Sequence, residues 1–126
     1  MSATEARVLI IEDNDALRAM LFTVLRHQPL GVDTAIGAED ALEKAQAGRY
    51  SLFLVDVEMP GIDGFEFVSR TRAHPVLREV PAILVTSRAS ADDRRRGEES
   101  GARAYIVKSE FEQNRFLETV RQLVSQ

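Results

Sequence analysis

The segment LFLVDVEMPGIDG, residues 52–64, joins an apolar run directly to a carboxylate and a sharp turn. Four apolar residues, 52–55, lead into Asp56, and Pro60 and Gly61 follow shortly after. An apolar run without polar alternation is typical of a strand that is covered on both faces, as in a parallel sheet. Asp56, at the end of that strand, has four open roles: turn former, metal ligand, general base or nucleophile.

Similar apolar runs recur along the chain and alternate with helical patterns. The runs are Val8–Ile11, Ala82–Val85, Tyr105–Val107 and, more weakly, Val32–Ile36. Between them, apolar residues recur at the spacing of a helix face: Leu17, Met20, Leu21, Val24 and Leu25, then Ala41, Leu42 and Ala45 before a stop at Gly48, then Phe65 and Val68, and finally Leu117, Val120, Leu123 and Val124. Strand and helix alternate five times, which predicts an α/β fold with an open, doubly wound sheet and helices on both faces.

The fourth predicted helix, Ala91–Ser100, differs from the others because its sequence ADDRRRGEES has almost no apolar face. Ser90 and Asp93 form a capping pattern at its start, and Gly97 costs such a helix about 1 kcal/mol relative to alanine. We therefore expect this helix to be among the more easily moved parts of the fold. Acidic residues flank Arg94–Arg96, which favours a solvated helix face over a partner surface.

The length of 126 residues suits one domain, and we assign residues 1–126 to a single unit. A net charge of −4 argues against general nucleic-acid binding. The absence of cysteine excludes disulfides and thiolate metal sites, and the apolar runs are far too short to span a membrane. We expect a cytoplasmic monomer, and an initial Met without an evident linker at the other end favours a freestanding chain.

Chemically active side chains follow the four strong apolar runs: Glu12 and Asp13 the first, Asp56 the second, Thr86 and Ser87 the third, and Lys108 the last. In a parallel sheet the carboxyl ends of the strands share one edge, where ligands bind. Three carboxylates packed together raise one another's pKa values, and a divalent cation relieves the repulsion. Oxygen ligands without cysteine predict a hard cation such as Mg²⁺. Asp56 is then the natural nucleophile for phosphorus, with Lys108 and Thr86 positioned to contact phosphoryl oxygens.

This set of residues, in this order, resembles the receiver domain of two-component response regulators over essentially the whole chain. The residues that carry the resemblance are Glu12-Asp13, Asp56, Met59-Pro60-Gly61, Asp63-Gly64, Thr86, Tyr105 and Lys108. The resemblance implies a flavodoxin-like (βα)5 three-layer sandwich whose parallel five-stranded sheet has the order 2-1-3-4-5. It also implies that Asp56 accepts a phosphoryl group from a histidine kinase. Mg²⁺ would be bound by Glu12, Asp13, Asp56 and the backbone carbonyl of Glu58, with Asp13 the direct ligand of the acidic pair.

The same resemblance implies a molecular switch. Thr86 corresponds to the switching hydroxyl, Lys108 to the invariant amine and Tyr105 to the aromatic residue that rotates on activation. Their movement would reshape the surface formed by the fourth helix, the fifth strand and the last helix, and a downstream protein target would bind there. The chain would then be no enzyme beyond its own phosphorylation and dephosphorylation. The residue patterns alone leave simpler alternatives: core filling for Tyr105, and helix capping for residues 13–15.

Ser109 departs from the family pattern, which has proline joined by a cis bond after the lysine. A cis bond before a non-proline residue costs about 2.5–4 kcal/mol, so we expect a trans bond between Lys108 and Ser109. Ser109 and Glu112 match a capping box, which predicts Ser109 as the N-cap of the last helix. The segment SEFEQNRFLETVRQL, residues 109–123, resembles receivers that are fused to chemotaxis-type kinases.

Several functions remain open at this stage. The leading hypothesis is a phosphorylation-dependent switch, either freestanding or as the receiver segment of a hybrid chemotaxis-type kinase, or a phosphate sink. An aspartyl-phosphate phosphohydrolase would use Asp56 with Glu58 as a second acid, although that motif requires aspartate there and begins after the first strand. A phosphate-independent binding module has the same fold but does not need the full set of site residues. Flavin binding is disfavoured, because the residues 12–15, EDND, would repel its phosphate.

Overall fold

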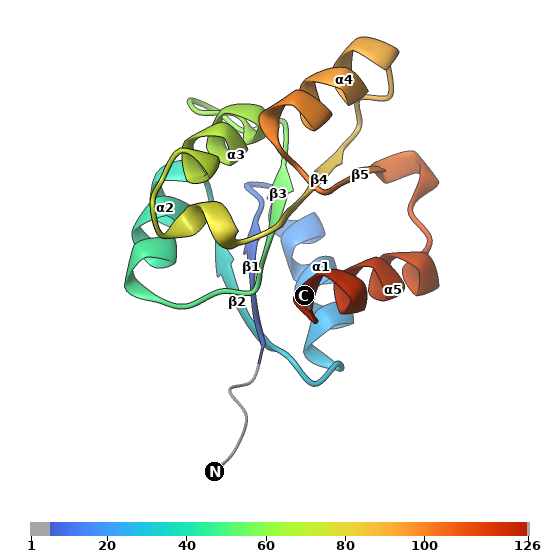
Figure 1. Ribbon diagram of the computed structural model, residues 1–126. Coiled ribbons are helices and arrows are strands. Elements are labelled where there is room, and N and C mark those ends of the chain that lie inside the picture. The colour runs from blue at the N-terminus through green and yellow to red at the C-terminus, as the bar shows by residue number, and fades with distance from the viewer. Residues whose placement is uncertain (1–5, 126) are drawn as a thin grey trace.

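The computed structural model describes residues 6–125, in which five strands alternate with five α-helices (Figure 1). The strands are β1 (Arg7–Ile11), β2 (Gly31–Ala35), β3 (Leu52–Asp56), β4 (Ala82–Thr86) and β5 (Ala104–Val107). The helices are α1 (Asp15–Arg26), α2 (Ala38–Ala47), α3 (Gly64–Arg72), α4 (Ala91–Ser100) and α5 (Gln113–Val124), with two short 3₁₀ turns at Leu77–Glu79 and Lys108–Glu110.

All five strands are parallel, and their order across the sheet is β2-β1-β3-β4-β5. Helices α1 and α5 cover one face, whereas α2, α3 and α4 lie on the other (Figure 1). This arrangement confirms the predicted doubly wound, flavodoxin-like fold. The central position of β3 places its last residue, Asp56, beside Val85 of β4 and near the middle of the carboxyl edge.

Two apolar cores, one on each face of the sheet, explain the unbroken apolar runs. Leu9 and Ile11 of β1 face the core beneath α2 and α3, and Val8 and Ile10 face the core beneath α1 and α5. Because every second residue enters a different core, the strands need apolar side chains on both faces. Within the described residues, no helix combines the length and apolar character needed to cross a membrane.

Strand β2 lies at the edge of the sheet and is displaced by one residue from its predicted position, whereas each of the other four strands is one residue longer than its apolar run. It ends at Ala35, so Ile36, which we expected to complete it, lies outside the strand and is 64% exposed. An edge strand is paired on one side only, which makes its ends weakly defined. The polar Asp33 of this strand accepts hydrogen bonds from Arg7 at 2.8 Å and from the Tyr50 hydroxyl at 2.7 Å.

Helix α4 begins and ends where the sequence predicts, and the Ser90 hydroxyl accepts a hydrogen bond from the backbone N–H of Asp93 at 3.1 Å. Its buried residues are Gly97 and Ser100, so it contributes no large apolar side chain to either core. Tyr105 of β5 packs directly on Gly97: a Cβ at Gly97 would lie 2.7 Å from Cδ2 of the ring. Only glycine therefore permits this close approach of α4 to the sheet.

Two arginines of α4 also contact neighbouring elements. The Arg96 guanidinium lies over the Phe65 ring of α3, 4.4 Å from the centroid, and 4.0 Å from a carboxylate oxygen of Asp63. Arg94 lies over the ring of Tyr105 at 5.6 Å. The arginines are therefore not simply solvated, as expected, because their cation–π contacts attach this polar helix to α3 and β5.

The predicted N-cap of α5 was wrong. Ser109 lies inside the 3₁₀ turn Lys108–Glu110, and the helix is capped by Glu112, whose carboxylate accepts a hydrogen bond from the backbone N–H of Arg115 at 2.8 Å. The intervening turn moves the start of the helix to Gln113, beyond the reach of a serine at position 109. The expected trans bond between Lys108 and Ser109 is confirmed, since residues 6–125 contain no cis peptide.

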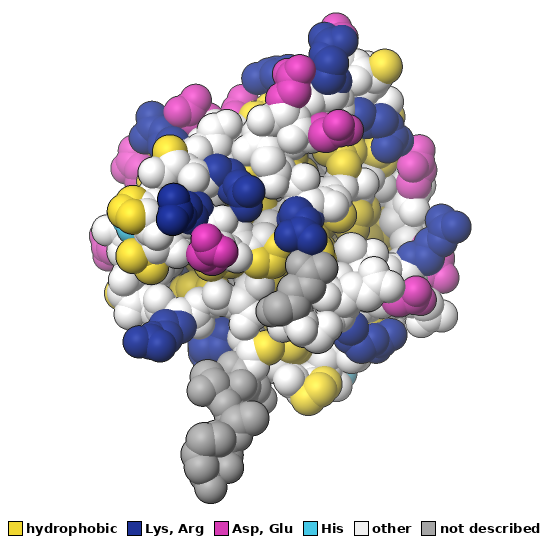
Figure 2. All heavy atoms as spheres, in the orientation of Figure 1, with side chains coloured by type: hydrophobic (Ala, Val, Ile, Leu, Met, Phe, Trp, Pro, Cys, Tyr) yellow, Lys and Arg dark blue, Asp and Glu magenta, His cyan; other side chains and the backbone are white. Residues whose placement is uncertain are grey.

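Charged side chains are spread widely over the surface. Figure 2 shows Lys and Arg side chains interspersed with Asp and Glu side chains over the face in view. Ion pairs within single helices contribute to this mixture, such as Lys44 with Asp40 in α2 at 3.3 Å and Arg70 with Glu66 in α3 at 2.9 Å. Each such exposed pair stabilises the fold by only about 0.3–0.5 kcal/mol.

Candidate functional site

Four polar side chains meet at the carboxyl edge of the sheet. Asp56 ends β3 and Thr86 ends β4, while Glu12 follows β1 and Lys108 follows β5. Glu12 is 1% exposed, Asp56 3% and Thr86 0%. Buried polar side chains at strand ends, in the crevice where ligands bind in this type of fold, define the candidate site.

The loop after Asp56 is held tightly against the strand that precedes it. The backbone N–H of Gly64 donates to the carbonyl of Val57 at 2.9 Å, and a Cβ at Gly64 would lie 2.5 Å from the carbonyl oxygen of Asp56. Asp63 caps α3 by accepting a hydrogen bond from the backbone N–H of Glu66 at 2.9 Å. The Asp63-Gly64 pair of the sequence therefore fixes the backbone that carries Asp56.

Three carboxylates converge as the strand ends predicted. Glu12, Asp13 and Asp56 each offer one oxygen, and these oxygens all lie within 4.8 Å of one another. Glu12 and Asp56 are buried, whereas Asp13 is exposed at the mouth of the cluster. Asn14, and not Asp13, caps α1, since its side chain accepts a hydrogen bond from the backbone N–H of Leu17 at 2.9 Å. Asp13 is therefore available for another role.

Lys108 supplies the positive charge of the site. Its Nζ lies 3.2 Å from Oδ1 of Asp56 and 3.8 Å from Oε1 of Glu12. Apart from the Lys108 ammonium, neither of these two buried oxygens has a hydrogen-bond donor. Buried oxygens without such a partner are unusual, and here both face the same small volume.

Burial dominates the electrostatics of the two inner acids. It raises the pKa of Glu12 to about 7, an effect that the neighbouring Asp56 carboxylate reinforces and that Asn14 and Lys108 oppose. Burial likewise raises the pKa of Asp56 above its ordinary value, although Lys108 opposes the shift. A single ammonium thus does not fully compensate two buried carboxylates.

The donor set fits a divalent metal ion. All three converging groups are carboxylates, and two of their oxygens are buried and have no hydrogen-bond donor apart from the Lys108 ammonium. Hard cations such as Mg²⁺ prefer oxygen ligands of this kind and usually retain several waters, for which the exposed side of the cluster at Asp13 leaves access. A bound dication would relieve the unfavourable burial of Glu12 and Asp56.

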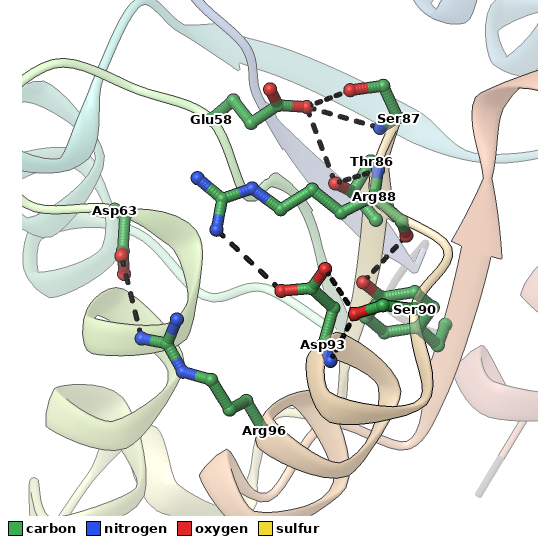
Figure 3. A network of polar contacts seen from close by, with 9 residues as sticks. Glu58, Asp63, Thr86, Ser87, Arg88, Ser90, Asp93 and Arg96 are labelled. Carbon is green, nitrogen blue, oxygen red and sulfur yellow. Dashed lines mark hydrogen bonds and ion pairs between the residues drawn. The ribbon is translucent and has the colours of Figure 1, made fainter.

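The Glu58 side chain forms a feature that the sequence did not predict. One oxygen, Oε1, accepts hydrogen bonds from the Thr86 hydroxyl at 3.5 Å, from the backbone N–H of Ser87 at 3.2 Å and from the Ser87 hydroxyl (Figure 3). The hydrogen bonds from the Ser87 hydroxyl and backbone N–H hold the pKa of Glu58 below its ordinary value, against the opposing effect of burial. The family resemblance implied a role for the backbone carbonyl of Glu58 alone; the side chain is exposed but forms these contacts. The available signal was that Glu58 and Ser87 both belong to loops at the same sheet edge.

Tyr105 lies on the other side of the loop that follows β4. Its hydroxyl donates to the carbonyl of Arg88 at 2.9 Å, and its ring contacts Gly97 and lies under Arg94. Burial raises the pKa of its hydroxyl. The aromatic ring therefore connects the loop between β4 and α4 to the surface formed by α4 and β5.

The fold and the site together define a doubly wound α/β domain with an acidic pocket and a lysine at its carboxyl edge. The chain belongs to the response regulator receiver domain family, whose model matches residues 8–121. Receiver domains of this family are signalling domains that bind Mg²⁺ at an acidic pocket, and the family implies phosphorylation-dependent signalling with a histidine kinase as phosphodonor and downstream targets.

Curated relatives share the receiver region with this chain. A gliding motility regulatory protein of Myxococcus xanthus is 38% identical over 110 residues, which cover 87% of this chain and 14% of that protein. The transcriptional regulatory protein AfsQ1 of Streptomyces coelicolor is 43% identical over 101 residues, covering 80% of this chain and 44% of that protein. The chain therefore spans less than half the length of these relatives.

Solved structures match over nearly their full length. The chemotaxis protein CheY4 of Vibrio cholerae has a TM-score of 0.88 at 31% identity, covering 95% of this chain and 99% of that chain. A putative response regulator of Chloroflexus aurantiacus has a TM-score of 0.91 at 29% identity, covering 98% of this chain and 100% of that chain. The fold is thus shared with chemotaxis-type receivers.

Proposed function

We propose that residues 1–126 form a single receiver domain that accepts a phosphoryl group onto Asp56 from a histidine kinase. The observation that carries this proposal is the position of the buried Oδ1 of Asp56, which lies 3.2 Å from the Lys108 ammonium and has no other hydrogen-bond donor. A carboxylate oxygen held in this way is free to attack phosphorus, and the ammonium beside it neutralises the charge that arrives. The proposal puts the chain in the cytoplasm as a monomer.

In the proposed reaction, an Asp56 carboxylate oxygen attacks phosphorus while the bond between phosphorus and the imidazole nitrogen of the kinase histidine breaks. The products are an acyl phosphate on Asp56 and a neutral histidine: the ring nitrogen that held phosphorus keeps the electron pair of the broken bond, and the other ring nitrogen carries the proton. Glu12, Asp13, Asp56 and the backbone carbonyl of Glu58 would hold Mg²⁺, which supplies positive charge to the transferring phosphoryl oxygens. Lys108 would contact one of these oxygens and Thr86 another.

Phosphorylation would then act on the surface formed by α4, β5 and α5. Thr86 would move toward the phosphoryl group, Tyr105 would change its packing beside Gly97, and a protein target that prefers the new surface would shift the population toward it. The weak apolar anchoring of α4 supports this choice of output surface, because such an element moves at low cost. The same chemistry holds in a freestanding receiver, a phosphate sink or a segment of a hybrid kinase.

Intact-protein mass spectrometry tests the proposal. The protein is incubated with Mg²⁺ and acetyl phosphate, and the expected result is the mass gain of one phosphoryl group on the wild type. Asp56→Asn keeps the size of the side chain but removes the nucleophile and is expected to gain nothing. Equal labelling of both proteins, or none of the wild type, would contradict the assignment of Asp56.

A further inference from the structure

The Thr86 hydroxyl is already engaged in this structure. It donates to Oε1 of Glu58 at 3.5 Å and accepts a hydrogen bond from the backbone N–H of Arg88 at 3.0 Å (Figure 3). A hydroxyl has one proton to donate. The 3.5 Å contact with Glu58 is long, and a phosphoryl oxygen on Asp56 would compete with Glu58 for this single proton.

Ser87 binds the Glu58 carboxylate more strongly than Thr86 does. Both its backbone N–H, at 3.2 Å, and its hydroxyl donate to Oε1 of Glu58. Hydrogen bonds to an ionised acceptor are roughly twice as strong as neutral ones. Because Ser87 directly follows Thr86, the last residue of β4, a carboxylate that fixes Ser87 fixes the first loop residue beside the Thr86 side chain.

The far end of the loop is anchored independently of Glu58. The Arg88 guanidinium lies 3.7 Å from a carboxylate oxygen of Asp93, the Ser90 hydroxyl donates to Asp93 at 2.7 Å, and the Tyr105 hydroxyl donates to the Arg88 carbonyl at 2.9 Å. Loss of the Glu58 contacts would consequently free Ser87 and the Thr86 hydroxyl, whereas the Thr86 backbone stays paired with Val107 in the sheet and Arg88 stays attached to α4.

We infer that the Glu58 side chain is a positioning residue: a latch that holds Thr86 and Ser87 in the unphosphorylated arrangement and opposes phosphoryl binding at Asp56. This inference rests on the proposed function, since it concerns the same site. It assigns the carboxylate of Glu58 a role separate from that of its backbone carbonyl. The latch would therefore set the fraction of molecules that become phosphorylated at a given concentration of phosphodonor.

Equilibrium binding of beryllium trifluoride in the presence of Mg²⁺ tests the latch, because this mimic of a phosphoryl group is not hydrolysed. Glu58→Gln weakens the contacts by removing the charge, and Ser87→Ala removes one contact without changing any charge. Each variant is expected to bind the mimic about fivefold more tightly than the wild type, which corresponds to ~1 kcal/mol. The double variant is expected to gain less than the product of the two single effects, because both changes break the same interaction.

A second measurement reports the latch directly. In ¹H–¹⁵N NMR spectra, the Ser87 amide proton is expected to shift upfield in Glu58→Gln, because its charged acceptor is lost. If Glu58→Gln bound beryllium trifluoride more tightly but Ser87→Ala did not, the effect would come from the charge of Glu58 alone, and the latch would be overturned. If the wild type binds the mimic and both variants bind it with the same affinity as the wild type, the latch is also overturned. A wild type that neither binds the mimic nor gains phosphoryl mass would instead overturn the proposed function, and the latch with it.

Discussion

Gly97 of α4 and Tyr105 of β5 lie in such close contact that a Cβ at position 97 would be 2.7 Å from Cδ2 of the tyrosine ring. Glycine normally weakens a helix, and replacing it with alanine stabilises one by about 1 kcal/mol. Here the methyl group would force the ring out of its position, and overpacking of this kind costs about 1–3 kcal/mol. The two effects oppose each other, and the steric cost of the contact exceeds the gain in helix propensity.

The first prediction concerns Gly97→Ala, which we expect to lower the free energy of unfolding by ~1 kcal/mol. Urea denaturation followed by circular dichroism measures this change. In a Tyr105→Ala background the ring is absent, and the same substitution is expected to become stabilising. If Gly97→Ala stabilised the protein in both backgrounds, the close contact would have no energetic importance.

The second prediction concerns the arginines of α4. Arg96 contacts Phe65 and Asp63 of the neighbouring segment, whereas Arg95 is paired with Asp92 of its own helix at 2.7 Å. Arg96→Ala is expected to cost about 0.5–1 kcal/mol of local stability and to speed hydrogen exchange of the α4 amides several-fold. Arg95→Ala serves as the matched control and is expected to change exchange much less. Similar effects of the two variants would argue against attachment of α4 through Arg96.

The third prediction concerns the pH dependence of metal binding. The pKa of Glu12 is raised to about 7 in the metal-free fold, and a metal ligand must lose its proton before it binds. Mg²⁺ affinity is therefore expected to rise with pH up to about 7 and to level off above it, by at most tenfold per pH unit. Isothermal titration calorimetry between pH 5.5 and 8 measures this dependence. Glu12→Gln is expected to bind more weakly and to flatten the profile; an unchanged profile would show that another group controls it.

The same pKa sets the sign of the stability change without metal. Because the folded state of Glu12 holds its proton more tightly than the unfolded state, this group disfavours folding progressively as pH rises from about 4.5 to about 7. Mg²⁺ reverses the penalty, so the rise in melting temperature on adding Mg²⁺ is expected to be larger at pH 8 than at pH 5.5. A metal-induced rise that is equal at both pH values would contradict this assignment.

The fourth prediction concerns Asp33 at the edge strand. The hydrogen bond from Arg7, helped by the one from Tyr50, lowers the pKa of Asp33 below its ordinary value. Its stabilising contribution is present above a pH of about 4 and is lost as pH falls through the lowered native value. The melting temperature of Asp33→Asn should therefore lie below that of the wild type at pH 6, with a gap that closes toward pH 2.5. Asp92→Asn, in an exposed pair, is the control; a gap for Asp33→Asn that widens in acid would refute the prediction.

The convergence of Glu12, Asp56 and Lys108 was predictable because parallel strands bring their carboxyl ends to one edge whatever the details of the loops. The rule needs only the strand positions, and these follow from unbroken apolar runs. The strand predicted from Val32 to Ile36 had a weaker pattern, and it was shifted by one residue at the sheet edge.

Contacts that depend on loop conformation were not predictable in the same way. Glu58 and Ser87 are 29 residues apart, and nothing in local spacing indicates that the side chain of one receives two hydrogen bonds from the other. At Ser109 a local pattern was present but misleading: the sequence matches a capping box, yet Ser109 lies in the 3₁₀ turn that follows β5 and Glu112 caps the helix. Sequence patterns determined the backbone frame here, whereas the pairing of exposed polar groups required coordinates.

Helix α4 buries only a glycine and a serine, so its outer face is largely uncoupled from the folding of the rest of the domain. Substitutions there change the surface of the domain while leaving the two cores intact. If α4 belongs to the output surface, as we propose, natural variation can change its binding preferences at little risk of misfolding and without altering Asp56, Thr86 or Lys108.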